Sequence, residues 1–163
     1  MPGDDVDRIV AAWRRERPDL DVSPLQVLSR VSRLARRLDL ARGAAFAEHG
    51  LDGWEFDVLA ALRRTGRPYE LSPGQLASET LVTSGTMTNR VDRLVDRGLV
   101  ARRPSRADRR GVRVRLTDSG RRKVDAAFEH LLQREVAILA ELDADDRREL
   151  TELLRRLLRP LGG

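Results

Sequence analysis

The sequence has no cysteine, few aromatic residues and no long apolar run. Of its 163 residues, 40% are hydrophobic but only 4% are aromatic. The absence of cysteine excludes disulfides, thiolate catalysis and cysteine-ligated zinc. No apolar segment approaches the roughly 20 residues that a membrane-spanning helix needs, and no signal-peptide core follows Met1. We therefore expect a soluble, cytoplasmic protein of one ordinary domain, or one domain with arms that a partner covers.

Histidine is also scarce, since the chain has only His49 and His130. They lie far apart in the sequence, so we expect neither a histidine metal site nor a catalytic triad. His49 follows a predicted helix, where a solvated or capping role is expected. The sequence also lacks a phosphate-binding glycine loop and convergent carboxylates. We therefore predict no metal, no cofactor and no enzymatic activity.

Positive charge is concentrated in one part of the chain. Residues 83–116 contain ten arginines and three aspartates, a net charge of +7, whereas the whole chain carries +5. The remainder is therefore slightly negative, at −2. Because these arginines span a predicted helix, a turn and two predicted strands, they are more than one solvated helix face. They predict a surface that binds a polyanion.

Amphipathic patterns predict two helices before residue 50. The first covers about residues 5–17 and ends before Pro18. The second reaches about residue 48, and its start at Ser23, Pro24 and Gln26 fits a capping box with proline at the first helical position. Its apolar stripe is wider than a monomer of this length is expected to cover.

Three shorter helices follow, at about residues 52–65, 72–80 and 84–97. Capping boxes predict the first two starts, and Gly98 occupies the expected position after the third helix. Because the last two helices are joined by only a few residues, they predict a helix-turn-helix.

A basic β-hairpin is predicted directly after the helix-turn-helix. Residues 112–116 alternate apolar side chains with arginine, which is typical of a half-buried strand, and residues 99–103 form the expected partner strand. Such a hairpin in this position is a wing. Thr117 then begins a predicted helix to about residue 141, and Asp143 begins a last helix that ends before Pro160.

The expected fold is mainly α with a small β-wing, a winged helix-turn-helix between N- and C-terminal dimerisation helices. Residues 1–50 would form the extra N-terminal helix and a dimerisation helix, residues 51–120 the DNA-binding domain, and residues 121–163 the C-terminal dimerisation helices. A homodimer explains the apolar stripes of both arms, because a monomer would leave them in water. The alternative is a closed monomeric bundle.

The third of the short helices has the composition of a recognition helix. Met87, Val91 and Leu94 share one face and are expected to point inward. The other faces carry short hydroxyls, an amide and two arginines, the groups that contact base edges in a major groove. The predicted DNA-binding residues are Ser84, Thr86, Thr88, Asn89, Arg90 and Arg93 of this helix and Arg106, Arg109 and Arg110 of the wing tip, which would enter the minor groove. The pattern does not separate residues that contact bases from residues that bind phosphates.

The wing and the helix after it resemble those of MarR-type repressors. The resemblance rests on Asp-Arg-Arg-Gly at residues 108–111 and on Val-Arg-Leu-Thr-Asp-Ser-Gly at residues 114–120. It covers nearly the whole chain, because that family also dimerises through its terminal helices. It implies a homodimer that binds a pseudo-palindromic DNA operator and is released by a small-molecule effector.

A narrower resemblance is to the urate-responsive, PecS-type branch of that family. It rests on residues 6–13, 55–59 and 83–90. That branch has a tryptophan in an extra N-terminal helix, an aspartate and an arginine seven residues apart, and an arginine that opens the wing. Trp13, Asp57, Arg64 and Arg102 occupy these positions. The resemblance thus implies a ligand site for urate, a planar monoanion that guanidinium groups can pair with and an indole can stack on.

Two other functions remain open. A MarR-type regulator that responds to a phenolic or other aromatic ligand would use apolar side chains, and substitution of Asp57 would have no effect. A winged-helix protein-interaction module would bind DNA weakly and without specificity, which the local charge and the Thr86, Asn89 and Arg93 face argue against.

Overall fold

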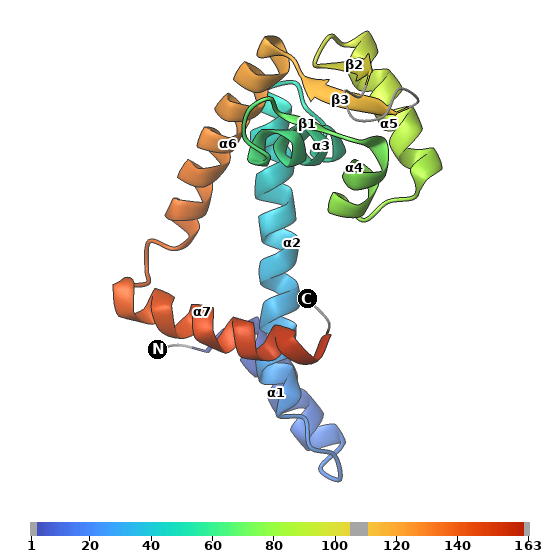
Figure 1. Cartoon of the computed structure of the whole chain (residues 1–163). Coiled ribbons are helices and arrows are strands. Elements are labelled where there is room, and N and C mark those ends of the chain that lie inside the picture. Colours follow the sequence, from blue (N-terminus) through green and yellow to red (C-terminus); the bar gives the residue numbers. More distant parts are fainter. Residues whose placement is uncertain (1–2, 105–110, 162–163) are drawn as a thin grey trace. The chain divides into compact units, whose positions relative to one another are not determined.

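The computed structural model describes residues 3–104 and 111–161 (Figure 1). The chain forms two compact units, Met1–Gly43 and Ala44–Gly163. Within the described ranges, no helix has the length and apolar character needed to cross a membrane.

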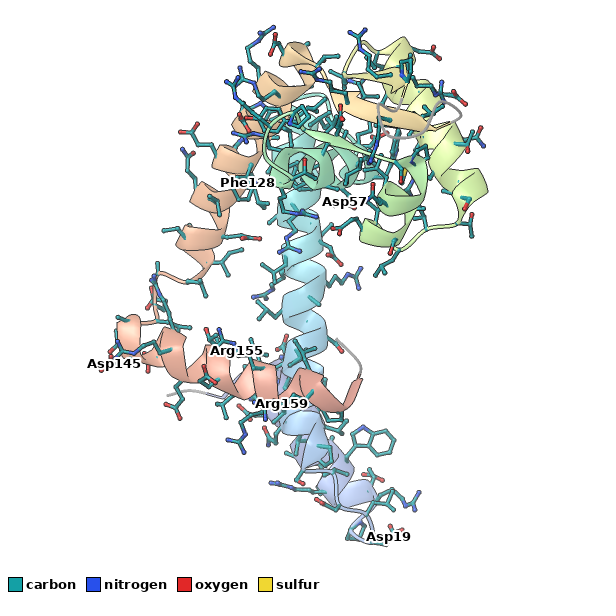
Figure 2. All side chains as sticks on the ribbon, viewed as in Figure 1. Asp19, Asp57, Phe128, Asp145, Arg155 and Arg159 are labelled. Atoms are coloured by element: carbon teal, nitrogen blue, oxygen red, sulfur yellow. The ribbon has the colours of Figure 1, made fainter. Side chains whose placement is uncertain are left out.

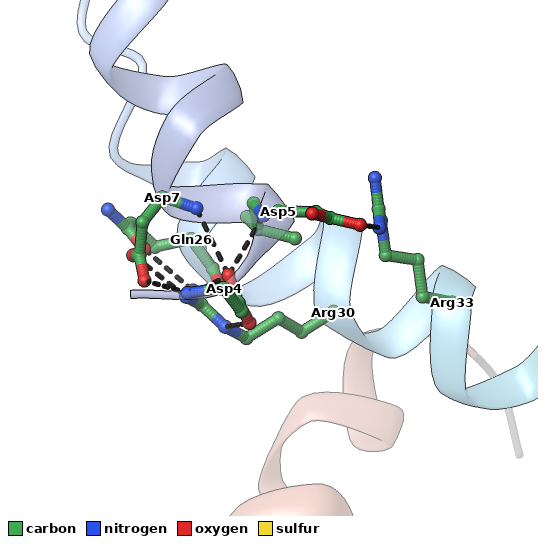
Figure 3. Close-up of polar contacts among 7 residues, drawn as sticks. Asp4, Asp5, Asp7, Gln26, Arg30 and Arg33 are labelled. Carbon is green, nitrogen blue, oxygen red and sulfur yellow. Dashed lines mark hydrogen bonds and ion pairs between the residues drawn. The ribbon is translucent and has the colours of Figure 1, made fainter. Parts of the chain in front are cut away.

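The first unit pairs helix α1 (Asp5–Glu16) with the first part of helix α2 (Pro24–Glu48). Asp4 caps α1, because its side chain accepts hydrogen bonds from the backbone N–H groups of Val6 and Asp7. Arg30 of α2 joins the two helices: its Nε lies 2.9 Å from Asp4 Oδ2 and its Nη2 lies 2.8 Å from Asp7 Oδ1 (Figure 3). Hydrogen bonds from this guanidinium lower the pKa of both carboxyl groups.

Helix α2 begins at Pro24 as predicted, but its cap differs from the predicted one. The Ser23 hydroxyl donates to the Asp21 carboxylate at 3.0 Å. The Gln26 side chain accepts from Arg30 Nη1 at 2.6 Å. Both side chains thus form hydrogen bonds with charged groups, which are stronger than hydrogen bonds between neutral groups. The predicted box between Ser23 and Gln26 is therefore wrong, although the helix start is correct.

The second unit contains the remaining elements in the predicted order. They are α3 (Gly53–Arg64), β1 (Glu70–Leu71), α4 (Pro73–Glu79), α5 (Ser84–Asp96), β2 (Val100–Pro104), β3 (Val112–Leu116), α6 (Asp118–Ile138), α7 (Ala144–Leu158) and the 3-10 turn η1 (Arg159–Leu161). The strands form an antiparallel sheet in the order β1-β3-β2. The predicted hairpin is confirmed, and the two-residue strand β1 adds a third strand that was not predicted.

The core of this unit lies between the end of α2, α3, α4, α5, the sheet and α6 as far as Leu131. Met87, Val91 and Leu94 of α5 are at most 1% exposed, as their helical spacing predicted. Burial of such a side chain contributes about 1.5–3 kcal/mol to folding. The inward face of α5 is therefore fixed, and its other faces are available to solvent.

Gly120 allows helix α6 to begin directly against the wing. The backbone N–H of Thr117 donates to the Leu99 carbonyl at 3.1 Å, and the Thr117 side chain accepts from the Gly120 N–H at 3.0 Å. A Cβ atom on Gly120 would lie only 2.1 Å from the Leu99 carbonyl oxygen. Glycine is therefore required at this close approach.

The C-terminal helices carry apolar side chains that the described chain does not cover. No residue of α7 is buried. Its exposed apolar residues are Leu153, Leu154, Leu157 and Leu158, and those in α6 and the turn after it are Phe128, Leu132, Val136, Ile138 and Leu139. Helix α7 is amphipathic all the same, so its apolar face is a surface suited to a partner.

Candidate nucleic-acid interface

Helix α5 presents its predicted contact residues to solvent. Thr83 caps the helix, because its hydroxyl accepts from the Thr86 N–H at 3.3 Å. Ser84, Thr86, Thr88, Asn89 and Arg93 are exposed, and Arg90 is half-buried. Gly85 has open space where a side chain would stand. The exposed face is thus made of small and polar groups, which lets a base edge approach the helix closely.

An ion pair with a buried carboxylate fixes the C-terminal end of α5. Glu55, in the first turn of α3, is 1% exposed and accepts hydrogen bonds from Arg97 through both carboxylate oxygens. Arg97 also donates to the Gly50 carbonyl at 2.7 Å. The carboxylate therefore caps α3, where it accepts from the Asp52 N–H at 2.9 Å, and also holds the residue that ends α5.

A second ion pair joins α5 to the wing. Arg102 of β2 lies opposite Val114 of β3, so its side chain leaves the sheet on the core side. There its Nη2 lies 2.5 Å from Asp92 Oδ1 of α5. Both side chains are about half exposed, so the pair links two elements while remaining accessible to solvent and ligand.

Trp54 of α3 contacts α5 through two arginines. The guanidinium carbons of Arg90 and Arg93 lie 5.4 and 4.9 Å from the centre of its indole ring. Both distances are within the range of a cation–π interaction. The predicted DNA-binding arginines are therefore held beside α3, a contact that the sequence did not predict.

The wing carries further arginines on the outer face of its sheet. Arg103 and Arg113 lie opposite each other on β2 and β3, and Arg115 is two residues further along the same face. Arg113 donates to Gln75 Oε1 at 2.9 Å. The other predicted wing contacts, Arg106, Arg109 and Arg110, lie outside the described residues. The strands β2 and β3 on either side of them are paired.

Two predicted ligand residues line one pocket on α3. Asp57 and Arg64, two turns apart, border a pocket of about 300 Å³ together with Phe56, Ala60 and Glu79. Arg64 Nη2 lies 3.5 Å from Glu79 Oε2 in an exposed ion pair. Figure 2 labels Asp57 at this position of α3.

A more apolar pocket adjoins the first one. It has a volume of about 310 Å³ and shares Phe56, Ala60 and Arg64 with it. Its other side is formed by α6, from which Phe128 lines it (Figure 2). Arg63 Nε donates to Asp125 Oδ1 at 2.8 Å in its wall. Arg64 thus borders two neighbouring cavities, each close to the lower size limit of small-molecule sites.

The other two predicted ligand residues are Trp13 and Arg102. Trp13 belongs to α1 in the first unit and is 50% exposed. Arg102 lines neither pocket on α3 and contacts the recognition helix instead. The ligand site of four residues therefore stays a prediction, and Asp57 and Arg64 are the two of its residues that border one pocket.

The two histidines lie together although they are far apart in the sequence. Their ring centroids are 5.6 Å apart in an edge-to-face arrangement. His130 Nδ1 lies 3.1 Å from Glu48 Oε2, and its Nε2 accepts from Arg134 Nε at 3.3 Å. His49 is partly exposed, but its Nε2 is buried without a hydrogen-bond partner in the described chain, so this nitrogen is not solvated. Across residues 3–104 and 111–161, no cluster of three or more potential ligand residues could hold a metal ion.

These features define a class of protein. A helix-turn-helix whose second helix is polar and exposed, followed by an arginine-rich hairpin, is a winged-helix DNA-binding domain.

Comparison with known proteins identifies the family. A model of the MarR family matches residues 49–111. The chain is 39% identical to the HTH-type transcriptional regulator PecS of Dickeya dadantii, over 94% of this chain and 92% of that protein. It is 32% identical to the HTH-type transcriptional repressor NicR of Pseudomonas putida, over 85% of this chain and 89% of that protein. Among solved structures, a variant of MarR from E. coli complexed with operator DNA matches with a TM-score of 0.68 at 26% identity, over 85% of this chain and 99% of that chain.

The chain belongs to the MarR family. It is a DNA-binding transcriptional regulator with a winged helix-turn-helix, and not an enzyme. The resemblance seen in the wing and in the N-terminal helix is thus confirmed at the level of the family and of similarity to PecS.

Proposed function

We propose that the protein is a homodimeric repressor that binds a pseudo-palindromic operator in the cytoplasm and is released by a small aromatic anion, for which urate is our candidate. The observation that carries the proposal is the combination of an exposed polar face on α5 with a charged pocket on α3 of the same unit. One surface supplies DNA contacts and the other a ligand site, which are the two sites that allosteric release requires.

Dimerisation follows from the uncovered apolar faces. Residues 1–50 and 121–163 supply the dimer contacts in this proposal, and residues 51–120 supply the DNA-binding domain. The exposed leucines of α7 and the exposed Phe128 of α6 would be costly to leave in water. A two-fold dimer buries the same surface of both protomers and presents two recognition helices to two half-sites.

The ligand site is built around Arg64. Its guanidinium can pair with the oxygens of a planar anion, and its exposed partner Glu79 holds it only weakly. The carboxylate of Asp57 in the same pocket would repel such an anion, so binding requires a local rearrangement. Trp13 of the extra helix would supply the stacking indole in the assembled site.

Arg102 can transmit ligand binding to the DNA-binding surface. Its ion pair with Asp92 holds β2 to the recognition helix. A ligand anion that engages Arg102 competes with Asp92 for the guanidinium, and α5 then loses one of its contacts. The ligand thereby favours a dimer in which the spacing of the recognition helices no longer matches the operator.

The experiment is a titration of a labelled duplex from the gene's own upstream region, at fixed, near-physiological salt. Specific binding that urate weakens at millimolar or lower concentration supports the whole proposal. Specific binding that urate leaves unchanged retains the repressor and rejects the ligand. If the upstream duplex and other candidate operators are bound no better than unrelated DNA, the repressor itself is rejected.

Substitution of Arg64 tests the site directly. Arg64→Ala should weaken urate binding at least about tenfold, the loss of one charged hydrogen-bonding partner. Arg122→Ala, an exposed arginine of α6, is the matched control and should leave urate affinity unchanged. Unchanged affinity in Arg64→Ala would reject the assignment.

A phenolic effector is the second candidate, because the pocket beside Phe128 is largely apolar. Asp57→Asn distinguishes the two. It should alter the response to urate, whereas a phenol held by apolar contacts would be bound as tightly as before.

A further inference from the structure

The recognition helix is held on both flanks by side chains from neighbouring elements. On one flank Asp92 is paired with Arg102 of the wing. About 160° away around the helix, Arg90 lies over the ring of Trp54, and Arg93 follows one turn later over the same ring. At about 100° per residue, Asn89 lies about 60° and Thr86 about 120° from Asp92 around the helix, on either side of Arg93, so these residues share the exposed arc with the two arginines.

Arg90 and Arg93 differ in their partners from three other arginines of this unit. Arg97 is paired with Glu55, Arg102 with Asp92, and Arg63 with Asp125. Within the described part of the chain, neither Arg90 nor Arg93 has a carboxylate partner, and the contact recorded for each is the indole of Trp54. Their charge is therefore not neutralised by a neighbouring carboxylate, while their side chains are still held in place.

Stacking on an aromatic ring leaves a guanidinium able to bind an anion. The face of the planar group lies against the ring, and its N–H donors point outward from its edge. An arginine that pairs with a carboxylate has already used some of those donors, and its charge is neutralised. An arginine that stacks has lost part of its rotamer freedom before binding, so less entropy is lost when it meets a phosphate.

We propose that Trp54 is a positioning residue for DNA binding, which holds Arg90 and Arg93 beside α3 so that they bind backbone phosphates at one edge of the major groove. The inference rests on the proposed DNA-binding function. It adds that some residues of α5 bind phosphates while others contact bases. Asn89 and Thr86, whose hydroxyl lies 2.9 Å from the Thr83 hydroxyl in the same turn, are left to contact bases.

The test compares Trp54→Leu and Trp54→Phe with the wild-type protein on the specific duplex and on an unrelated duplex, each at several salt concentrations. Loss of phosphate contacts weakens binding to all sequences and lowers the salt dependence, by about one unit of slope for each contact. Trp54→Leu should therefore weaken binding about tenfold on both duplexes, with a shallower salt slope. Trp54→Phe retains an aromatic face and should fall between it and the wild type.

A double-mutant cycle separates positioning from simple loss of stability. Arg93→Ala should cost less affinity in the Trp54→Leu background than in the wild type, because the unsupported arginine already binds poorly. Arg148→Ala on α7, far along the chain from the stacked pair, is the control and should cost the same in both backgrounds. Additive losses for Arg93→Ala would overturn the proposal.

A fluorescence measurement follows the stacking without DNA. In a Trp13→Phe background Trp54 is the remaining tryptophan. Replacement of both arginines by alanine should expose its ring to water and shift its emission to the red, with the circular dichroism spectrum unchanged. An unshifted emission overturns the stacking.

Failure of the inference about Trp54 can be distinguished from failure of the proposed repressor function. A Trp54→Leu variant that is folded and keeps the wild-type affinity and salt slope overturns the inference while leaving the repressor intact. If the wild-type protein binds no duplex with sequence specificity, the proposed function on which the inference rests is rejected.

Discussion

The carboxylate of Glu55 accepts hydrogen bonds from the guanidinium of Arg97, so an ion pair joins the first turn of α3 to the residue that ends the recognition helix. Glu55 is 1% exposed, while the arginine side chain is 39% exposed. The arginine reaches from the surface to a buried charge. The position of the recognition helix in the domain therefore depends on a charge that water does not stabilise.

Glu55→Gln should destabilise the fold by about 1–3 kcal/mol, because the neutral amide leaves the arginine without a charged acceptor and is itself buried. Urea unfolding followed by circular dichroism measures the change. Glu79→Gln is the matched control: its partner Arg64 is 63% exposed and 3.5 Å away, so its loss should cost less than about 0.5 kcal/mol. An equal loss of unfolding free energy in the two variants would show that the burial of Glu55 does not strengthen its ion pair.

Gly120→Ala should destabilise the fold on the order of 3 kcal/mol. The added Cβ would meet the Leu99 carbonyl oxygen at 2.1 Å, and backbone on both sides must move to relieve the overlap. Gly85→Ala is the control, because open space surrounds that position in α5. It should change the unfolding free energy by less than about 1 kcal/mol. A tolerated Gly120→Ala would mean that the wing and α6 are not tightly joined.

Much of the fold could be predicted because it depends on local signals. Asp52, Ser72, Thr117 and Asp143 precede their helices, and each helix begins directly after them. The alternation of Val112 to Leu116 predicted a strand, and period 3.6 predicted the buried face of α5.

The contacts between elements could not be predicted in the same way. Glu55 belongs to the capping box that predicted the start of α3, but nothing in its neighbourhood indicated Arg97, which is 42 residues further along. Trp54 is the second residue of a helix, a position that gives no information about which elements it contacts. Strand β1 has two residues and too short a pattern to detect. The candidate ligand site has the same limitation, since seven-residue spacing placed Asp57 and Arg64 on one pocket but said nothing of Glu79.

Asp92→Asn should separate DNA binding from its release. Removal of a negative charge from the recognition helix should strengthen binding to unrelated DNA about threefold, because less negative charge repels the phosphates. The same change breaks the ion pair with Arg102, so the weakening of operator binding by urate should shrink by about threefold or more. Electrophoretic mobility shift with and without urate measures both effects. A full urate response in this variant would exclude Arg102 as the route of coupling.

Leu157→Arg should convert the proposed dimer to a monomer. Leu157 is 39% exposed on the apolar face of α7, and a charge there cannot be buried against a second protomer. Sedimentation equilibrium measures the mass, and loss of one of two half-sites should lower operator affinity about a hundredfold. Arg156→Ala, a neighbour that removes a charge from the same helix, should remain dimeric. A dimeric Leu157→Arg variant would place the interface elsewhere.

Acidification should weaken the ion pairs that join α1 to α2, which Arg30 makes with Asp4 and Asp7. Asp4 and Asp7 have pKa values below the ordinary 3.8, chiefly because Arg30 donates hydrogen bonds to their ionised forms. A carboxyl group with a lowered pKa in the folded state contributes stability that is fully present above its unfolded pKa. The contribution is lost as the pH falls through the folded value. The link between the helices should therefore be constant from pH 7 to about pH 5 and weaken below pH 4.

The variant Arg30→Gln, which lacks the ion pairs with Asp4 and Asp7 at every pH, is compared with the wild type. At pH 7 the variant should show faster hydrogen exchange in α1 than the wild type, because both carboxylates have lost their charged donor. As the pH falls below 4, the wild type should approach the variant, since protonated carboxyl groups no longer attract the guanidinium. Arg8→Gln serves as control: Arg8 pairs with Asp5 within α1 and is 79% exposed, so its exchange should match the wild type throughout. A difference between wild type and Arg30→Gln that persists unchanged at pH 3 would show that Arg30 acts through packing of its aliphatic stem rather than through its charge.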